Sequence, residues 1–480
     1  MSGPIAGACP SSVDVAAGSA GSESREGEAA RSARERRYAL FVASFLALVY
    51  TFNFMDRQIM SVLQEQIRRE LGLSDTQLGL LTGLSFAIFY TTFGIPVAWL
   101  SDRTRRVGIM AAACGIWSIA TAGCGLARSF VQLAVARVLV GAGEAGGSPP
   151  SYSLISDYFP PSQRGTGLAI YSLGVPIGSA LGVALGGWVA ADHGWRAAFV
   201  AVGLPGLLLA VLMPIVMREP RRGGLDAPSG SAFEHEGAAS LLQTIRAFLA
   251  DPILVCTAIS SGLSAFIGYA MLSWNPSFLA RVKGMQLGQI AHYYSLIIGV
   301  TGLIGTFAAG WLVDHLGRRD RRWYAWLPAI AFTVALPAFL GLLWAPSWPV
   351  ALGFVTVLAL LGNVYLAPAL AVVQNATAPS RRGVAGATLL FLLNLIGLGG
   401  GPLFVGWMSD MAHAQGSPQP LLMGYAALLP IIVLTIVAHL FTSRALAGGA
   451  SQSAAREFIT RYSNNNLSSS TDSIPREGRS

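Results

Sequence analysis

Lysine is almost missing from this 480-residue chain, which has one, Lys283, beside 31 arginines. Charged residues of all kinds make up 12% of the sequence, about half the share found in soluble domains. A phosphate-binding loop that ends in Gly-Lys-Ser or Gly-Lys-Thr is excluded, because Lys283 follows a valine. The chain therefore carries no nucleotide-hydrolysing motor of that type.

Residues that build metal sites and hydrolase sites are also scarce. The four cysteines contain no Cys-x-x-Cys pair, and three of them lie in apolar runs, where we expect small packing residues. The six histidines are scattered, and the motifs HExxH and GxSxG do not occur. We therefore expect no metal, no cofactor and no enzyme. The net charge of +8 falls in short loops rather than on one face, so we expect no nucleic-acid partner.

Apolar residues dominate instead, at 53% of the chain with a mean hydropathy of +0.54. Twelve apolar runs are long enough to span a bilayer. They cover about 38–63, 77–100, 107–127, 130–158, 163–190, 196–217, 251–281, 287–316, 323–345, 347–377, 381–412 and 419–445. We therefore expect an all-α integral membrane protein with twelve transmembrane helices.

The polar segments divide the chain into five regions. We expect a disordered cytoplasmic tail over 1–37, a six-helix bundle over 38–217, a cytoplasmic linker over 218–250, a second six-helix bundle over 251–445, and a disordered tail over 446–480. Apart from two arginines inside spans, 24 Lys and Arg residues fall on the side of the termini and six on the other. The positive-inside rule places both termini in the cytoplasm, which for a bacterial chain means insertion in the inner membrane.

The two halves repeat each other. The segment GIPVAWLSDRTRR at 94–106 matches AAGWLVDHLGRRDRR at 308–322, which aligns Asp102 with Asp314. The segment PPSQRGTGLAIYSLGVPIG at 160–178 matches APSRRGVAGATLLFLLNLIG at 378–397, which aligns Arg164 with Arg382. Two six-helix pseudo-repeats predict a substrate path between the halves near the membrane midplane.

Charges at membrane depth mark the candidate site. The stretch RVLVGAGEAGGSPP at 137–150 places Arg137 and Glu144 two turns apart on one helix face, and Asp56 and Arg57 lie deep in the first span. Such charges must face a protein interior or a water-filled cavity. Two alternatives stay open, a buried ion pair that only locks helices together and a site for substrate and protons. Arg57 either joins this cluster or pairs locally.

These features together resemble the major facilitator superfamily. The Asp-Arg-x-x-Arg turn after span two and its copy after span eight carry that resemblance, with Ala98 and Arg105 where the superfamily pattern has glycine. Within the superfamily the chain is most similar to spinster-like transporters, through NFMDR at 53–57, GEA at 143–145, SDYFP at 156–160 and WNPSFL at 274–279. The resemblance covers roughly 38–445 and implies alternating access, proton coupling and, from eukaryotic members, lysolipid-like substrates.

Two further groups of residues complete the expected machinery. At the helix ends on the side of the termini, charges that pair across the bundles would form a cytoplasmic gate: Asp102, Arg103, Arg106, Arg164, Asp314, Arg318 and Arg382. In the second half, polar and aromatic side chains either pack and hydrogen-bond between helices or line the cavity: Tyr269, Trp274, Asn275, Asn363, Tyr365 and Asn394. An uncharged lining of this kind suits an amphipathic ligand.

We therefore expect a monomeric, proton-coupled secondary transporter of a lysolipid-like or other amphipathic organic molecule. Efflux of drugs or metabolites and transport of a small organic anion, with Arg137 as the anion ligand, are the alternatives within the same class. A non-transporting membrane receptor is the alternative from another class, although a receptor would not need charges inside the membrane.

Overall fold

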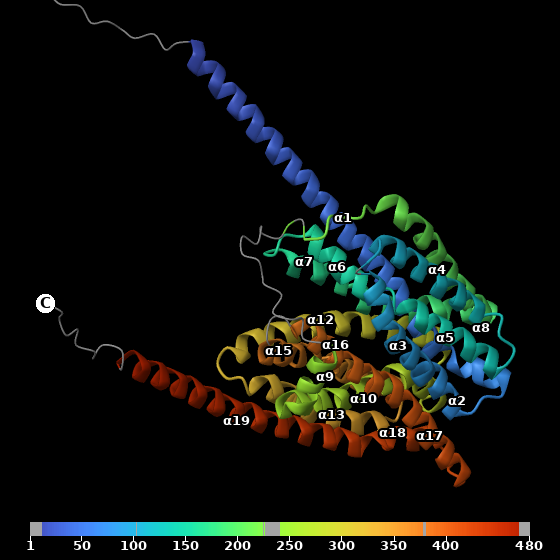
Figure 1. Cartoon of the computed structure of the whole chain (residues 1–480). Coiled ribbons are helices and arrows are strands. Elements are labelled where there is room, and N and C mark those ends of the chain that lie inside the picture. The colour runs from blue at the N-terminus through green and yellow to red at the C-terminus, as the bar shows by residue number, and fades with distance from the viewer. Residues whose placement is uncertain (1–11, 102, 224, 226–240, 378–380, 470–480) are drawn as a thin grey trace, which may run out of the picture.

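The computed structural model describes residues 12–101, 103–223, 225, 241–377 and 381–469. Within these residues the chain is helical and contains no strand. The helices form two bundles, which lie one above the other in Figure 1. Helices suit apolar runs of this length because each backbone N–H and C=O is bonded within its own segment and none is exposed to lipid.

The first bundle is built by the first half of the chain. Its elements are α1 (Ser12–Leu71), α2 (Asp75–Gly79), the π-helical turn η1 (Leu80–Leu84), α3 (Ser85–Ser101), α4 (Arg106–Cys124), α5 (Phe130–Glu144), α6 (Ser148–Tyr158), α7 (Arg164–Ser172) and α8 (Gly174–Val216). The helix α8 contains two spans, because Gly194 has a φ of +80° and breaks the helix between them.

The second bundle follows the linker and repeats this order. Its elements are α9 (Leu241–Ala250), α10 (Pro252–Arg281), α11 (Leu287–Gln289), η2 (Ile290–Tyr294), α12 (Ser295–Gly317), α13 (Trp323–Trp344), α14 (Trp348–Leu361), α15 (Leu366–Ala376), α16 (Arg382–Leu393), η4 (Asn394–Gly400), α17 (Gly401–Ala414), α18 (Pro420–Ala426) and α19 (Leu428–Ser469). The short helix α9 packs on α16.

The twelve predicted spans are accounted for in the described part of the chain. Ten helices there are long and apolar enough to cross a membrane, and one of them, Arg164–Val216, holds two spans. Span four is divided between α5 and α6. The predicted fold class, twelve helices in two six-helix pseudo-repeats, is confirmed.

The repeat extends to the irregularities of the helices. A π-helical turn follows the first turn of span two at η1 and recurs in span eight at η2. The break between α5 and α6 recurs between α14 and α15. These matching interruptions indicate that the two halves share the same arrangement of helices.

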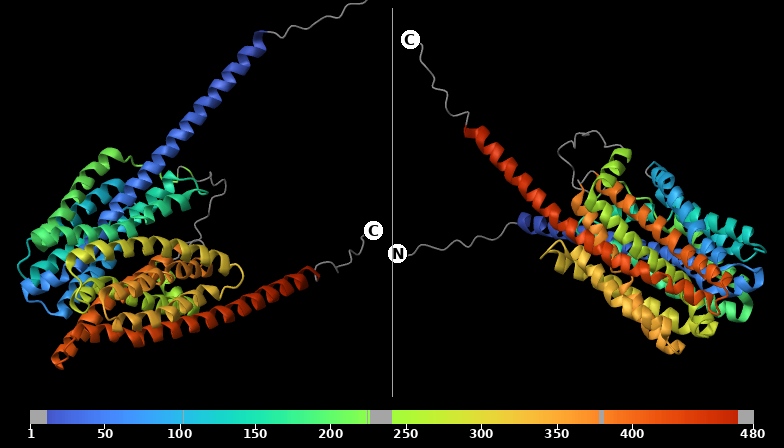
Figure 2. Two further views of the ribbon diagram at one scale, coloured as in Figure 1. Left: turned by 180° about the vertical axis from the view of Figure 1, so that it is seen from behind. Right: turned by 90° about the horizontal axis from the view of Figure 1, so that it is seen from below.

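Helices extend into both segments for which the sequence predicts tails. The helix α1 already begins at Ser12, and α19 continues to Ser469. Residues 12–37 contain no proline and many Ala, Glu and Arg, which favour a helix that continues from the span. The two helices project from the same end of the molecule (Figures 1 and 2).

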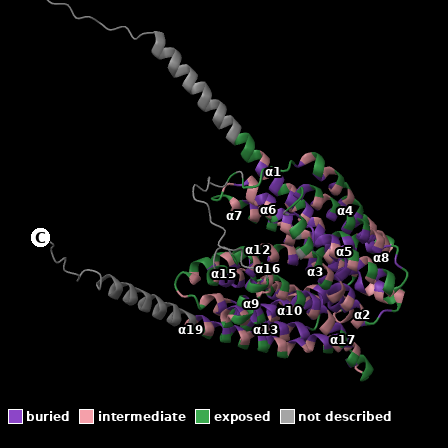
Figure 3. Ribbon diagram, in the orientation of Figure 1, coloured by how far each residue is buried: buried purple, intermediate pink, exposed green. Residues whose placement is uncertain are grey.

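The distribution of buried and exposed residues is that of a protein surrounded by lipid. Buried residues lie between the helices and where the bundles meet (Figure 3). Large apolar side chains remain exposed on the outside, among them Ile119, Val211, Trp311 and Phe441. Outward-facing apolar side chains of this kind suit contact with lipid. The two bundles pack closely through α2, η1 and α17, at the end away from the termini.

Candidate transport site

The glutamate of the predicted cluster sits at a helix end inside the membrane. The helix α5 stops at Glu144, and α6 starts again at Ser148, followed by Pro149 and Pro150. Prolines lack a backbone N–H and disrupt a continuous helix, so they account for the break. Glu144 is thereby held by its own helix where the chain turns, and it is only 1% exposed.

Arg57 is the partner of Glu144. Its Nε donates to Glu144 Oε2 at 2.7 Å, and the two side chains are 12% and 0% exposed. The guanidinium also lies over three aromatic rings, those of Phe54, Phe86 and Tyr90, at 4.7–4.9 Å. Rings at this distance attract a cation through their quadrupole. Arg57 therefore belongs to the cluster rather than to a separate local contact.

Arg137 does not bond either carboxylate, which differs from the pairing that the sequence suggested. Its Nε donates to the carbonyl of Leu81 at 3.2 Å, and Nη1 donates to the backbone carbonyl of Asp56 at 3.5 Å. The guanidinium also lies 5.3 Å from the centre of the Phe86 ring. Glu144 is paired with Arg57 of α1 instead.

Asp56 is buried behind these arginines. Its Oδ2 accepts a hydrogen bond from the Thr121 hydroxyl at 3.0 Å. Its other oxygen, like Glu144 Oε1, has no hydrogen-bond partner among the described residues. A buried carboxylate oxygen without a hydrogen-bond partner is costly. The described residues leave one such oxygen on each of the two acids.

A pocket lies against this cluster, between the two bundles. The space within its wall, including the part that is open to solvent, is about 430 Å³. Its wall is formed by residues from both halves: Phe54, Arg57, Gln58, Ser61, Thr82, Phe86, Arg137, Tyr269, Leu272, Ser273, Leu398 and Pro402. Both arginines reach the pocket, and the two acids lie behind them. The wall thus offers positive charge beside aromatic and aliphatic surface.

The predicted lining residues of the second bundle lie in different environments. Tyr269 lines the pocket. Trp274 is fully buried and donates from Nε1 to the Pro402 carbonyl at 2.8 Å. The amide of Asn275 is engaged by two tyrosines of its own bundle, Tyr294 and Tyr425.

The other three predicted lining residues are not part of the pocket wall. Tyr365 is buried in an apolar cluster of the second bundle, Asn363 is exposed, and Asn394 donates to the carbonyl of Leu390 at 2.9 Å. Of the six predicted lining residues, Tyr269 lies in the wall of this pocket in this conformation, and the contribution of the others to a substrate path stays a prediction. Asparagine and tyrosine in membrane helices often bond within their bundle, as they do here.

Three of the predicted gate residues that the structure describes have contacts within their own bundle. Arg103 lies over the Trp99 ring, Arg164 donates to the Ser156 carbonyl, and Arg382 donates to the Thr377 carbonyl. Asp314 and Arg318 are exposed. Asp102 lies outside the described residues. Pairing across the bundles at this end stays a prediction for the opposite conformation.

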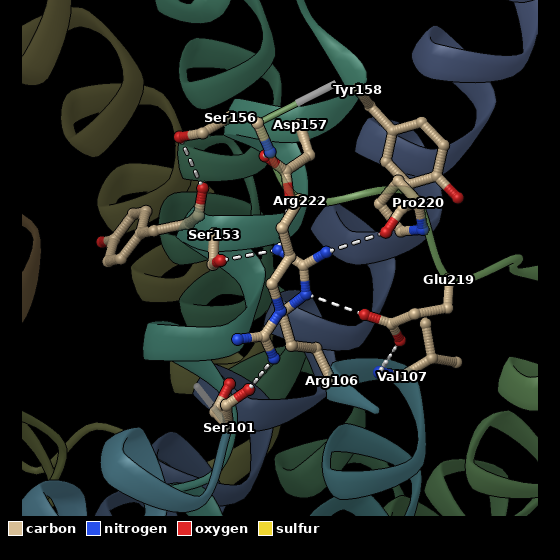
Figure 4. A network of polar contacts seen from close by, with 12 residues as sticks. Ser101, Arg106, Val107, Ser153, Ser156, Asp157, Tyr158, Glu219, Pro220 and Arg222 are labelled. Atoms are coloured by element: carbon tan, nitrogen blue, oxygen red, sulfur yellow. Dashed lines mark hydrogen bonds and ion pairs between the residues drawn. The ribbon is translucent and has the colours of Figure 1, made fainter. Parts of the chain in front are cut away.

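Arg106 has a structural task instead, shown in Figure 4. It bonds Asp157 at 2.5 Å, Glu219 at 2.8 Å and the Ser153 hydroxyl at 2.7 Å. These contacts fasten the start of the linker to spans three and four of the first bundle. In this conformation its side chain is 1% exposed and is occupied by these contacts, so a role of Arg106 in the gate stays a prediction.

A charged cluster at the opposite end joins the bundles and was missed by the sequence analysis. Arg281 of α10 bonds Glu65 at 2.5 Å and Asp75 at 2.6 Å, both from the first bundle. Asp410 of α17 accepts hydrogen bonds from the backbone N–H groups of Asp75 and Thr76. These five residues form what we call the distal lock. Its members lie at or near the ends of predicted spans, but nothing in the sequence pairs residues more than 200 positions apart.

The comparison with known families decides the identity. Residues 46–400 match the model of the Major Facilitator Superfamily. The chain belongs to this superfamily. An MFS-type efflux pump of Mycolicibacterium smegmatis is 33% identical over 401 residues, which cover 84% of this chain and 91% of that protein. A hexuronate transporter of Bacillus subtilis is 27% identical, with 82% and 94% covered.

The solved structures show which members of the superfamily this chain resembles. A bacterial homologue of the human lysosomal transporter spinster, in an inward-facing and unoccupied conformation, is 32% identical. It aligns with a TM-score of 0.73 and covers 85% of this chain and 96% of that one. The protein is therefore a spinster-like membrane transporter and not an enzyme, as the sequence predicted.

Proposed function

We propose that this transporter couples protons to the movement of an amphipathic, lysolipid-like organic anion. One observation carries the proposal: Arg57 faces the pocket between the bundles while Glu144, fully buried, holds it from behind. A cation at the pocket wall suits an anionic head group, and Phe54, Phe86 and Tyr269 suit an apolar part.

Coupling follows from competition for Arg57. When an anion bonds the guanidinium, Glu144 loses its partner, and a buried carboxylate without compensation takes up a proton. Protonation of Glu144 in turn frees Arg57 for the anion. Proton and anion therefore bind cooperatively, and Asp56 is a second acid within the same cluster.

Orientation is part of the proposal. The six basic residues opposite the termini include Arg281 and Lys283, against 24 on the termini side. This bias supports cytoplasmic termini in a bacterial inner membrane. The conformation, closed by the distal lock, would then face inward. A reporter enzyme that is active only outside the membrane, fused after Ser480, should stay inactive.

The test measures proton uptake on binding. The purified protein in weakly buffered detergent solution, with a pH-sensitive dye, should take up protons when a lysophosphatidate is added. Glu144→Gln should bind the same ligand without proton uptake. Proton-independent binding by the wild type would contradict the coupling.

The same assay separates the alternatives suggested by the relatives. A hexuronate offers a carboxylate for Arg57 but no apolar part, and a cationic drug offers no anion. A response to the hexuronate alone would favour a small-anion transporter, and a response to cations alone would favour drug efflux.

A further inference from the structure

One polar group of the pocket wall has no partner. Gln58 lies beside Arg57 on α1, is 3% exposed and lines the pocket. Its Oε1 is buried and accepts no hydrogen bond from any described residue. Buried polar atoms are nearly always bonded, so each exception calls for a physical cause.

The two hydroxyl groups of the wall nearest to Gln58 along the chain and in span two donate elsewhere. The hydroxyl of Ser61, one turn further along α1, donates to the carbonyls of Leu272 and Ser273 at 3.0 and 2.7 Å. The hydroxyl of Thr82 donates to the Leu78 carbonyl at 2.9 Å. On the other flank, α8 approaches through Gly182, where an added Cβ would lie 2.9 Å from the Cβ of Gln58. The stem of Gln58 is thus held in place while its carbonyl oxygen stays unsatisfied.

We infer that Gln58 is a specificity-determining residue, which accepts a hydrogen bond from a hydroxyl or amine that the substrate carries next to its anionic group. Arg57 and Gln58 are adjacent in sequence and reach the same pocket, so the two ligand groups they bind must also be neighbours. The inference rests on the proposed function and narrows its substrate class to hydroxylated or aminated organic anions. Simple alkyl anions would leave the Gln58 oxygen buried and unbonded, and are discriminated against for that reason.

The experiment compares two ligands that differ by one hydroxyl. The probes are 1-oleoyl lysophosphatidate, with its free glycerol hydroxyl, and the analogue that lacks this hydroxyl. Affinities are measured by calorimetry on the full-length protein in detergent. The wild type should bind the hydroxylated ligand about tenfold more tightly, as expected for one hydrogen bond to a buried acceptor.

Gln58→Leu removes the acceptor and keeps the apolar stem. It should lower affinity for the hydroxylated ligand about tenfold, leave the analogue unchanged and so abolish the preference. Gln66→Leu is the matched control, because Gln66 is another glutamine of α1 with an unpartnered Oε1, but its Nε2 bonds the Ala190 carbonyl away from the pocket. This control should keep the wild-type preference.

Each outcome decides the matter. Equal affinity of the wild type for both ligands, or a preference that survives Gln58→Leu, would overturn the inference while the proposed function stands. An equal loss for both ligands in Gln58→Leu would also overturn it, because that pattern indicates a packing role. Failure of the wild type to bind either anion would overturn the proposed function together with the inference.

Discussion

At the scale of single residues, the ion pair between Arg57 and Glu144 dominates the site. Its carboxylate has no exposed surface, and its guanidinium opens on the pocket. A buried pair of this kind adds little net stability, but loss of one partner is costly because the other charge remains. The pair is therefore better suited to switching than to holding the helices together.

A double-mutant cycle tests this interpretation. Arg57→Ala should destabilise the protein by about 3–5 kcal/mol, because Glu144 is left buried and unpaired. Glu144→Gln in the Arg57→Ala background should restore much of that loss, although transport stays abolished. Thermal unfolding in detergent measures both effects. The Arg57→Ala defect should also shrink as pH falls, since protonation removes the unpaired charge.

Purely additive effects of the two substitutions would contradict the coupling. A defect of Arg57→Ala that does not change between pH 8 and pH 5.5 would do the same, because it would show that Glu144 is already neutral.

At the scale of helices, the irregular segments gather where the bundles meet. The turn η1 packs against η4, and η2 packs against α8. Glycines let the backbones approach there: a Cβ on Gly79 would lie 2.5 Å from the Pro402 carbonyl oxygen, and one on Gly406 would lie 2.2 Å from that of Asp75. π-helical turns are common at functional sites, and here they shape the surfaces that must separate during transport.

A methyl group at this crossing should therefore force the bundles apart. Gly406→Ala should increase the distance between spin labels at Arg69 and His413, which are exposed on different bundles at this end. Gly94→Ala is the control, because an added Cβ there would meet nothing within 4 Å. The distance between the labels is measured by pulsed electron paramagnetic resonance in a protein from which the native cysteines have been removed. An unchanged distribution in a folded Gly406→Ala protein would refute the close-approach argument.

At the scale of the whole molecule, the distal lock joins the two bundles at the end away from the termini. Arg281 is 20% exposed and bonds two carboxylates of the other bundle, and Asp410 bonds the start of α2. A row of hydrogen bonds between α1 and α10, which we call the polar seam, continues from the lock. In it, Ser277 donates to Gln64 at 3.0 Å. The seam ends at Ser61 and Ser273, which also line the pocket. The pocket wall and the contacts between the bundles therefore share residues.

Removal of Arg281 should make the two bundles separate more often at the distal lock. Hydrogen bonds to charged groups contribute about 1.5–3 kcal/mol each, so Arg281→Gln should raise the population open at the lock about tenfold or more. Arg196→Gln is the matched control, because Arg196 pairs with Glu70 inside the first bundle. The spin-label pair of the previous experiment measures the opening.

The opposite end gives a second readout of the same variant. Arg281→Gln should bring the predicted gate together, so that cysteines placed at Arg103 and Arg318 cross-link more readily. A wild-type distance distribution in Arg281→Gln would mean that apolar packing alone closes this end.

The sequence by itself determined the parts of this protein that depend on local composition. Apolar runs determined the spans, the aligned turns at 94–106 and 308–322 determined the repeat, and charges at membrane depth marked Asp56, Arg57, Arg137 and Glu144. These features need no neighbour, because the bilayer imposes them on each helix separately.

Only the tertiary structure decided which of these groups meet. Helix rotation and the break after α5 place Glu144 against Arg57 rather than Arg137, and the packing of two bundles brings Arg281 to Glu65 and Asp75. Pairing across 87 or 206 positions depends on the angle and depth of whole helices, and a linear pattern of residues does not encode either quantity locally.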